Sequence, residues 1–66
     1  MENKIRELRE QLNLTQIDFA RELDVSRQTV ISLENGKYNP SLPLAYKISK
    51  VFNKTIEEIF IFEEDK

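Results

Sequence analysis

Apolar residues recur every three or four positions in two short segments, residues 16–23 and 27–34. In the two segments and the turn between them, the apolar residues with this spacing are Ile17, Phe19, Ala20, Leu23, Val25, Val30 and Leu33. This spacing gives each of two helices one apolar stripe. Thr15 and Ser26 stand just before the segments, where a hydroxyl accepts a backbone N–H of the first helical turn. The pattern therefore predicts two capped helices joined by a tight turn.

The turn between these helices fits a helix-turn-helix arrangement. Asp24 lies in the turn, and its short polar side chain tolerates a left-handed backbone better than most non-glycine residues do. Ala20 is small, and we expect it to face the angle between the helices. A larger side chain at that position would push the two helices apart.

Three further helices are predicted around this pair. Residues 2–12 form the first, with Asn3 as a candidate cap and apolar residues at Ile5, Leu8 and Leu12. Another helix follows the Ser41 cap, with Pro43 in its first turn, and continues to about Phe52. The last helix covers residues 56–60 after a Thr55 cap. Gly36 is expected to end the second central helix in a left-handed conformation.

The outer face of the second central helix is polar. It carries Arg27, Gln28 and Thr29 and, one turn further, Ser32. Arginine can donate two hydrogen bonds to a guanine edge, and glutamine can pair with an adenine edge. A helix start also favours phosphate, because its first backbone N–H groups are unpaired. The alternative is an ordinary solvated surface, but the turn pattern favours contact with DNA.

The run TQIDFARELDVSRQTVISLENGKYNPS resembles the Cro/C1-type (XRE-like) helix-turn-helix family of phage and bacterial repressors, and the likeness extends over residues 5–60. The size and the NPSL segment resemble small stand-alone dimeric repressors such as the cytolysin repressor. The resemblance implies an all-α domain of five helices over residues 1–66, with the helix-turn-helix at about 16–34 and with or without a short C-terminal strand. It further implies a homodimer that binds double-stranded DNA at a palindromic operator and represses transcription.

The outer face and the resemblance together name the expected DNA contacts. Base-reading residues are expected to be Arg27, Gln28 and Ser32, and backbone-contacting residues Gln16, Thr29, Asn35, Lys37 and Asn39. The resemblance also implies a structural ion pair between Arg9 and Glu34, with two independent surface charges as the alternative. Tyr38 is expected to pack over the loop rather than contact DNA.

Position 31 departs from the family pattern, which usually has a polar residue there. Ile31 could contact a thymine methyl group, pack under Tyr38 or be exposed, and the sequence does not choose among these. Ser32 is a weak reader of base identity, because a hydroxyl can donate or accept. Specificity is therefore expected to depend mainly on Arg27 and Gln28, with help from DNA shape.

Composition limits the other function classes. Sixty-six residues form one domain with a modest core, which oligomerisation would help to stabilise. The chain has neither Cys nor His, so it lacks a disulfide framework, a thiolate metal site and the usual general base. We expect no enzyme activity, no metal, no cofactor and no small-molecule ligand. No apolar run approaches the ~20 residues of a membrane span, and no signal-peptide core is present, so a cytoplasmic location is expected.

The net charge of −2 is unevenly distributed. Residues 25–54 carry five basic residues and one acid, whereas residues 56–66 carry five acids and one lysine. A basic region that meets phosphates and an acidic tail can therefore coexist in one small protein. Two ordinary solvated faces remain the alternative.

The C-terminal segment, residues 59–66, is expected to be a dimerisation segment with an acidic tail. Its four large apolar residues, Ile59, Phe60, Ile61 and Phe62, suggest a short strand. An uncovered strand of this kind promotes aggregation, and a two-fold partner would cover it. The alternative is that the tail folds back over its own core. A different function class also remains, in which the same fold is an antitoxin or adaptor that binds a protein partner.

Overall fold

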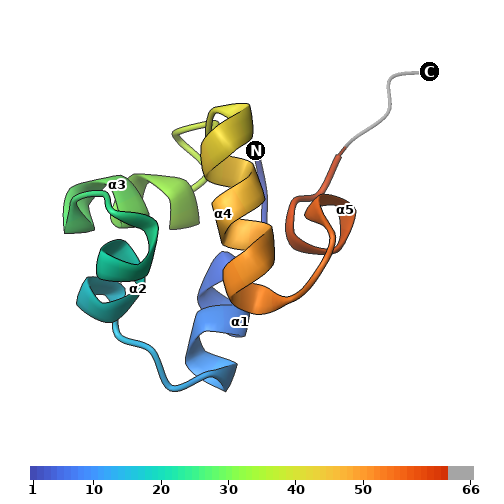
Figure 1. Ribbon diagram of the computed structural model, residues 1–66. Coiled ribbons are helices and arrows are strands. Elements are labelled where there is room, and N and C mark those ends of the chain that lie inside the picture. Colours follow the sequence, from blue (N-terminus) through green and yellow to red (C-terminus); the bar gives the residue numbers. More distant parts are fainter. Residues whose placement is uncertain (63–66) are drawn as a thin grey trace.

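The computed structural model describes residues 1–62 and contains five helices (Figure 1). These are α1 (Ile5–Gln11), α2 (Gln16–Leu23), α3 (Arg27–Glu34), α4 (Leu42–Phe52) and α5 (Ile56–Ile59). Helix α4 lies between the α2–α3 pair and α5 (Figure 1). The predicted all-α fold of five helices is confirmed, and so are the bounds predicted for α2 and α3. Over residues 1–62, no helix has the length and apolar character that crossing a bilayer would require.

The turn between α2 and α3 has the predicted geometry. The hydroxyls of Thr15 and Ser26 accept backbone N–H groups from the third residues of α2 and α3, respectively. Asp24 ends α2 in the left-handed conformation, with φ of 59° and ψ of 45°. The next residue, Val25, donates its N–H to the Ala20 carbonyl oxygen (3.0 Å), and Ala20 is buried. These local bonds fix the angle at which α3 leaves α2.

The core joins one face of each helix. Its members are Ile5, Leu8, Phe19, Ala20, Leu23, Val30, Leu33, Leu44, Ala45, Ile48, Phe52, Ile59 and Phe60. The rings of Phe19 and Phe52 stack with centroids 5.0 Å apart and connect α2 to α4. Leu12 and Ile17 were expected to face inward, but each side chain is 50% exposed. Both residues lie at helix ends, where no neighbouring helix covers the apolar stripe completely.

The first helix begins later than predicted, at Ile5 rather than Glu2. The preceding residues are extended instead, because they pair with the C-terminal segment. Lys4 donates its N–H to the Ile59 carbonyl oxygen, and the Ile61 N–H is donated to the Glu2 carbonyl oxygen, both at 2.8 Å. The expected C-terminal strand is reduced to this pairing, which forms one isolated antiparallel bridge between residues 3 and 60.

The later connections follow their predicted caps. Gly36 has a φ of +73° after the end of α3. The Ser41 hydroxyl accepts the Leu44 N–H at 3.3 Å, and Asn53 ends α4 in the left-handed conformation. Thr55 caps α5, which ends at Ile59, one residue earlier than predicted, because Phe60 is already extended.

Candidate nucleic-acid interface

Helix α3 presents its polar residues outward because its apolar residues are anchored in the core. Val30 and Leu33 are fully buried and fix the rotation of the helix about its axis. Arg27 and Gln28 are consequently exposed, and Thr29 is partly exposed. A helix of eight residues is about 12 Å long, and the major groove of B-DNA is about as wide. The exposed face of α3 can therefore enter a major groove.

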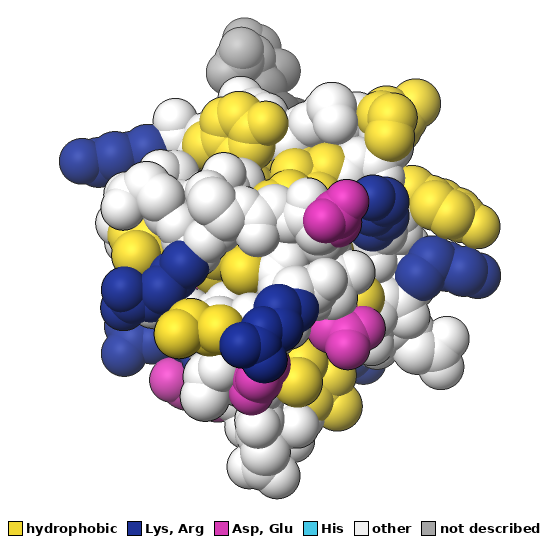
Figure 2. Space-filling model, turned by 60° about the vertical axis from the view of Figure 1, so that its left-hand side comes forward, with side chains coloured by type: hydrophobic (Ala, Val, Ile, Leu, Met, Phe, Trp, Pro, Cys, Tyr) yellow, Lys and Arg dark blue, Asp and Glu magenta, His cyan; other side chains and the backbone are white. Residues whose placement is uncertain are grey.

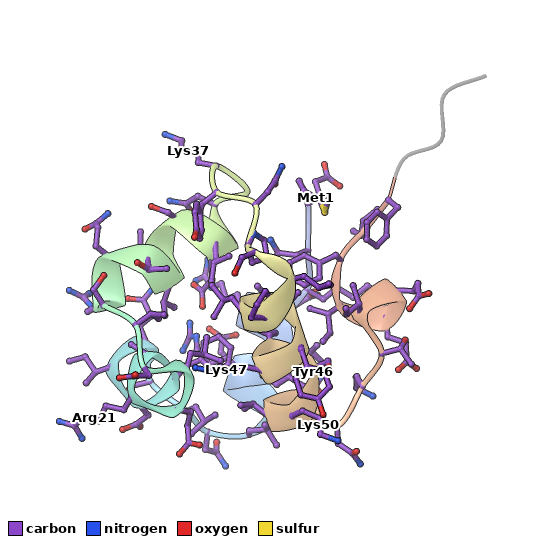
Figure 3. The ribbon with its side chains drawn as sticks, turned by 45° about the horizontal axis from the view of Figure 1, so that its top comes forward. Met1, Arg21, Lys37, Tyr46, Lys47 and Lys50 are labelled. Carbon is purple, nitrogen blue, oxygen red and sulfur yellow. The ribbon has the colours of Figure 1, made fainter. Side chains whose placement is uncertain are left out.

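The loop after α3 holds three of the residues predicted to contact the DNA backbone. Lys37 lines a hollow together with Gln28, whereas Asn35 and Asn39 line two others, both beside Met1. Asn35, Lys37 and Asn39 are all exposed. The Lys37 N–H is donated to the Ser32 carbonyl oxygen (3.1 Å), so the loop turns back on the end of α3. The Lys37 side chain projects away from the body of the molecule (Figure 3). Its charge is thus free to meet a phosphate beside the groove.

The structure brings Arg9 and Glu34 together behind α3. The Arg9 Nε donates to a Glu34 carboxylate oxygen at 2.6 Å, and the two side chains are 10% and 6% exposed. Arg9 also donates to the Leu14 carbonyl oxygen (2.8 Å). The Gln16 side chain donates to the other Glu34 oxygen at 3.2 Å, a contact that the sequence did not predict. The negative charge of Glu34, the last residue of α3, is therefore balanced by Arg9, and its carboxylate is held in place near the proposed DNA surface.

A shallow hollow of about 340 Å³ lies along the outer side of α3. It is lined by Ser26, Gln28, Thr29, Ser32, Lys37 and Tyr38. Tyr38 is 43% exposed and belongs to this surface, although the sequence favoured a packing role for it. Ile31 is partly buried. The sequence signal that could have identified Tyr38 is its position two residues after Gly36, where the chain turns back toward α3.

The charge of this side of the molecule is mixed. Figure 2 shows Lys and Arg side chains as well as Asp and Glu side chains on the face turned forward, some of them side by side, with hydrophobic and uncharged surface around them. This side of the molecule is therefore not the uniformly basic face that an extended phosphate-binding surface would offer.

The C-terminal residues divide into a buried and an exposed pair. Ile59 and Phe60 are part of the core, so the tail does fold back over its own chain at these two positions. Ile61 and Phe62 are exposed, at 40% and 55%. Of the residues predicted for a dimer interface, only these two remain accessible. The predicted acidic tail, residues 63–66, lies outside the described residues.

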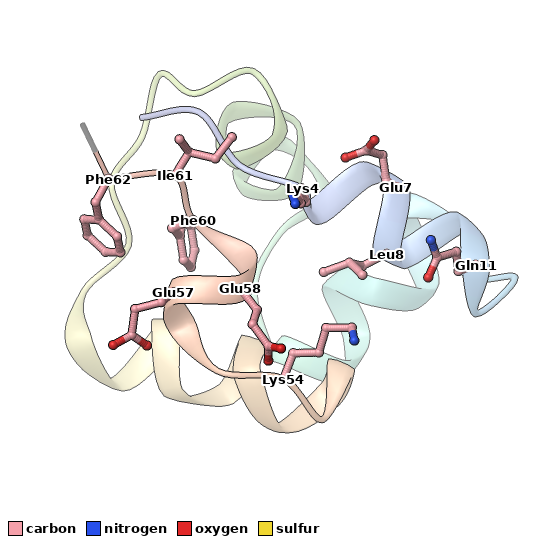
Figure 4. A pocket seen from close by; sticks show the side chains of 10 residues that line it. All are labelled: Lys4, Glu7, Leu8, Gln11, Lys54, Glu57, Glu58, Phe60, Ile61 and Phe62. Carbon is pink, nitrogen blue, oxygen red and sulfur yellow. The ribbon is translucent and has the colours of Figure 1, made fainter. Parts of the chain in front are cut away.

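Another hollow lies between α1 and the part of the chain that follows α4 (Figure 4). Its volume is about 760 Å³, and its lining combines Leu8 and Phe60 with charged side chains of both signs, among them Lys54 and Glu57. Ile61 and Phe62 also line it. This hollow therefore borders the exposed C-terminal residues, and Gln28 and Tyr38 line a separate hollow.

Comparison with known proteins identifies the family to which this arrangement belongs. The family model described as Helix-turn-helix matches residues 5–59, which is most of the chain. The chain belongs to the Cro/C1-type helix-turn-helix family. The resemblance inferred from the sequence is thereby confirmed, and the protein has the helix-turn-helix fold of DNA-binding transcriptional regulators.

Relatives of this Cro/C1-type domain match it over nearly its whole length. An uncharacterized HTH-type transcriptional regulator of Methanocaldococcus jannaschii is 56% identical over 66 residues, and the alignment covers all of this chain and all of the relative. Another, from Archaeoglobus fulgidus, is 53% identical over 66 residues, covering all of this chain and 93% of the relative. The control protein C.MunI of a Mycoplasma species is 42% identical over 59 residues, covering 88% of this chain and 80% of the relative. The individual DNA contacts of this Cro/C1-type domain stay predictions.

Proposed function

We propose that the protein is a cytoplasmic, dimeric repressor that occupies a palindromic operator. The observation that carries this proposal is the rotation of α3, which buries Val30 and Leu33 and exposes Arg27 and Gln28. Arg27 would read a guanine and Gln28 an adenine, with Ser32 as a weaker third contact. Gln16, Thr29, Asn35, Lys37 and Asn39 would hold the phosphate backbone on either side.

The exposed apolar surface near the C-terminus supports the dimer. Leu42, Ile61 and Phe62 are large apolar side chains left open to water in the single chain. A hollow of about 310 Å³ is lined by Leu42 and Phe62 and by other, mainly apolar residues, including Pro40 and Ile56. A two-fold copy would cover this surface and place two α3 helices in successive major grooves, about 34 Å apart. Repression would then require only that the dimer occupy a promoter.

Selection of binding sites from a random DNA pool tests this function. We expect a two-fold symmetric site with half-sites about one helical turn apart, and an affinity for it that falls steeply with salt. In a promoter assay, insertion of this site should lower transcription when the protein is present. Weak, unselective and fully salt-sensitive binding would contradict the proposal. If the protein selects no DNA and another protein co-purifies with it in a stoichiometric amount, the antitoxin or adaptor function would be favoured.

A further inference from the structure

Tyr38 is held beside the polar face of α3 by the fold of the following loop. Gly36 turns the chain at φ +73°, and the bond between the Lys37 N–H and the Ser32 carbonyl oxygen returns it along the helix. Tyr38 consequently lines the same hollow as Gln28 and Ser32, and it remains 43% exposed. A half-exposed aromatic side chain on a polar face gains contact area when a partner covers it.

The ring of Tyr38 is the aromatic surface of this hollow, whose other lining residues are polar and include the cation Lys37. The hydroxyls of Ser26 and Thr29 lie 3.0 Å apart and bond to each other, and the Ser26 oxygen also accepts the Thr29 N–H. One of the two O–H groups is thus engaged in the helix cap, and the other can still donate to a partner. Ser32 contributes only a short side chain, which leaves room. Gln28 lines the same hollow and can pair with adenine, and each adenine faces a thymine, whose methyl group is apolar.

We propose that this hollow receives the 5-methyl group of a thymine, with the ring of Tyr38 as its main apolar contact. The inference rests on the DNA-binding function proposed above and adds a specificity-determining residue from outside α3, the recognition helix that would read the bases. Ser32 leaves the space, and Tyr38 supplies the surface that a longer side chain at position 32 would otherwise occupy. The protein would then prefer thymine to cytosine at one position of each half-site.

Removal of single methyl groups from the DNA tests this contact. Each thymine of the selected operator is replaced in turn by deoxyuridine, and Kd is measured for the wild type, Tyr38→Ala and Tyr38→Phe. We expect one replacement to weaken wild-type binding about fourfold, because the methyl group that it removes would be buried in the complex. Replacement of the other thymines should have little effect. Tyr38→Ala should bind the unmodified operator more weakly and be insensitive to the replacement that weakens wild-type binding. Tyr38→Phe keeps the ring and should keep the wild-type sensitivity.

Tyr46→Ala is the matched control. Tyr46 is another exposed tyrosine, but it lies on α4 beside Lys50 and away from Lys37 (Figure 3). Its variant should show the wild-type methyl profile. The proposal is wrong if Tyr38→Ala keeps that profile, or if both Tyr38 variants lose affinity equally on every sequence, as loss of a hydroxyl–phosphate contact would cause. If the wild type selects no operator, the DNA-reading function fails as well, so the two failures are distinguishable.

Discussion

Glu34 ends the recognition helix and is the most constrained carboxylate on the proposed DNA side. It is paired with Arg9 at 2.6 Å, accepts a further bond from Gln16, and its side chain is 6% exposed. An unpaired carboxylate here would be costly to bury and would repel phosphate. The pair therefore keeps a negative group at the end of α3 without a net charge facing DNA.

Loss of the Arg9 guanidinium should reveal the cost of this buried charge. We expect Arg9→Met to lower the free energy of unfolding by about 3–5 kcal/mol, because Glu34 is left buried without its partner. The double variant Arg9→Met, Glu34→Leu should regain most of that loss, since no charge remains buried. Urea denaturation of the three proteins measures this. A loss within about 1 kcal/mol for the single variant would mean that the pair behaves like an exposed one.

Arg27 and Lys37 should separate base reading from backbone attraction. We expect Arg27→Ala to weaken operator binding by about 1–3 kcal/mol and to change binding to random DNA little. Lys37→Ala should weaken both by the same factor and lower the salt dependence by about one counterion. Fluorescence anisotropy at several salt concentrations measures both. Equal losses on the two DNAs for Arg27→Ala would contradict its base-reading role.

The starts of α2 and α5 are specified well by the sequence. At α2 and α5 a threonine hydroxyl caps the helix, and a carboxylate three residues later accepts the threonine N–H, at 3.1 Å for Asp18 and 2.8 Å for Glu58. These bonds join residues only three positions apart, so they can be predicted from the local sequence. The start of α3 is set in the same local way, by the Ser26 cap and the left-handed Asp24, and it decides how the helix proposed to read DNA is presented.

Acid should weaken the two capping boxes. The Thr15 N–H that Asp18 accepts lowers the pKa of that carboxyl below its ordinary value of 3.8, and the Thr55 N–H lowers the pKa of Glu58 below 4.5. Both pKa values are depressed in the folded state, so their stabilisation is present above the ordinary values and is lost as the pH falls through the folded ones. We expect the free energy of unfolding to fall from about pH 5 downward.

Asp18→Asn should show a smaller decrease between pH 5 and pH 3 than the wild type, because it removes one of the two capping carboxylates whose pKa is lowered. Glu22→Gln removes an exposed carboxylate from the same helix and serves as the control. Urea denaturation at several pH values measures the difference. Parallel curves for the wild type and Asp18→Asn would contradict this assignment.

At the scale of the whole molecule, the sequence predicts less because distant segments decide the outcome. The pattern identified the five helices and the rotation of α3, since both follow from local periodicity and caps. It placed the start of α1 three residues too early, because Asn3 and Lys4 pair with residues about 55 positions away. For the same reason it assigned Ile59 and Phe60 to an interface, whereas they complete the core of their own chain.

The exposed end of the chain should control the oligomeric state. We expect Phe62→Glu to convert the proposed dimer to a monomer, because a charge would be placed in an apolar contact. Helical content should be unchanged, since Phe62 is 55% exposed in the single chain. Sedimentation equilibrium measures the mass. Leu12→Glu, at a similarly exposed apolar position just after α1, should leave the mass unchanged. A dimer that survives Phe62→Glu would contradict this interface.

The pairing of residues 2–4 with residues 59–61 has a consequence for the order of folding. Its bonds join segments about 55 positions apart, whereas the turn between α2 and α3 is held by bonds between near neighbours. A long loop costs more entropy to close than a short one, so we expect the turn to form early and the pairing of the two end segments late. Local opening of the native domain should accordingly begin at this pairing and leave the turn between α2 and α3 intact.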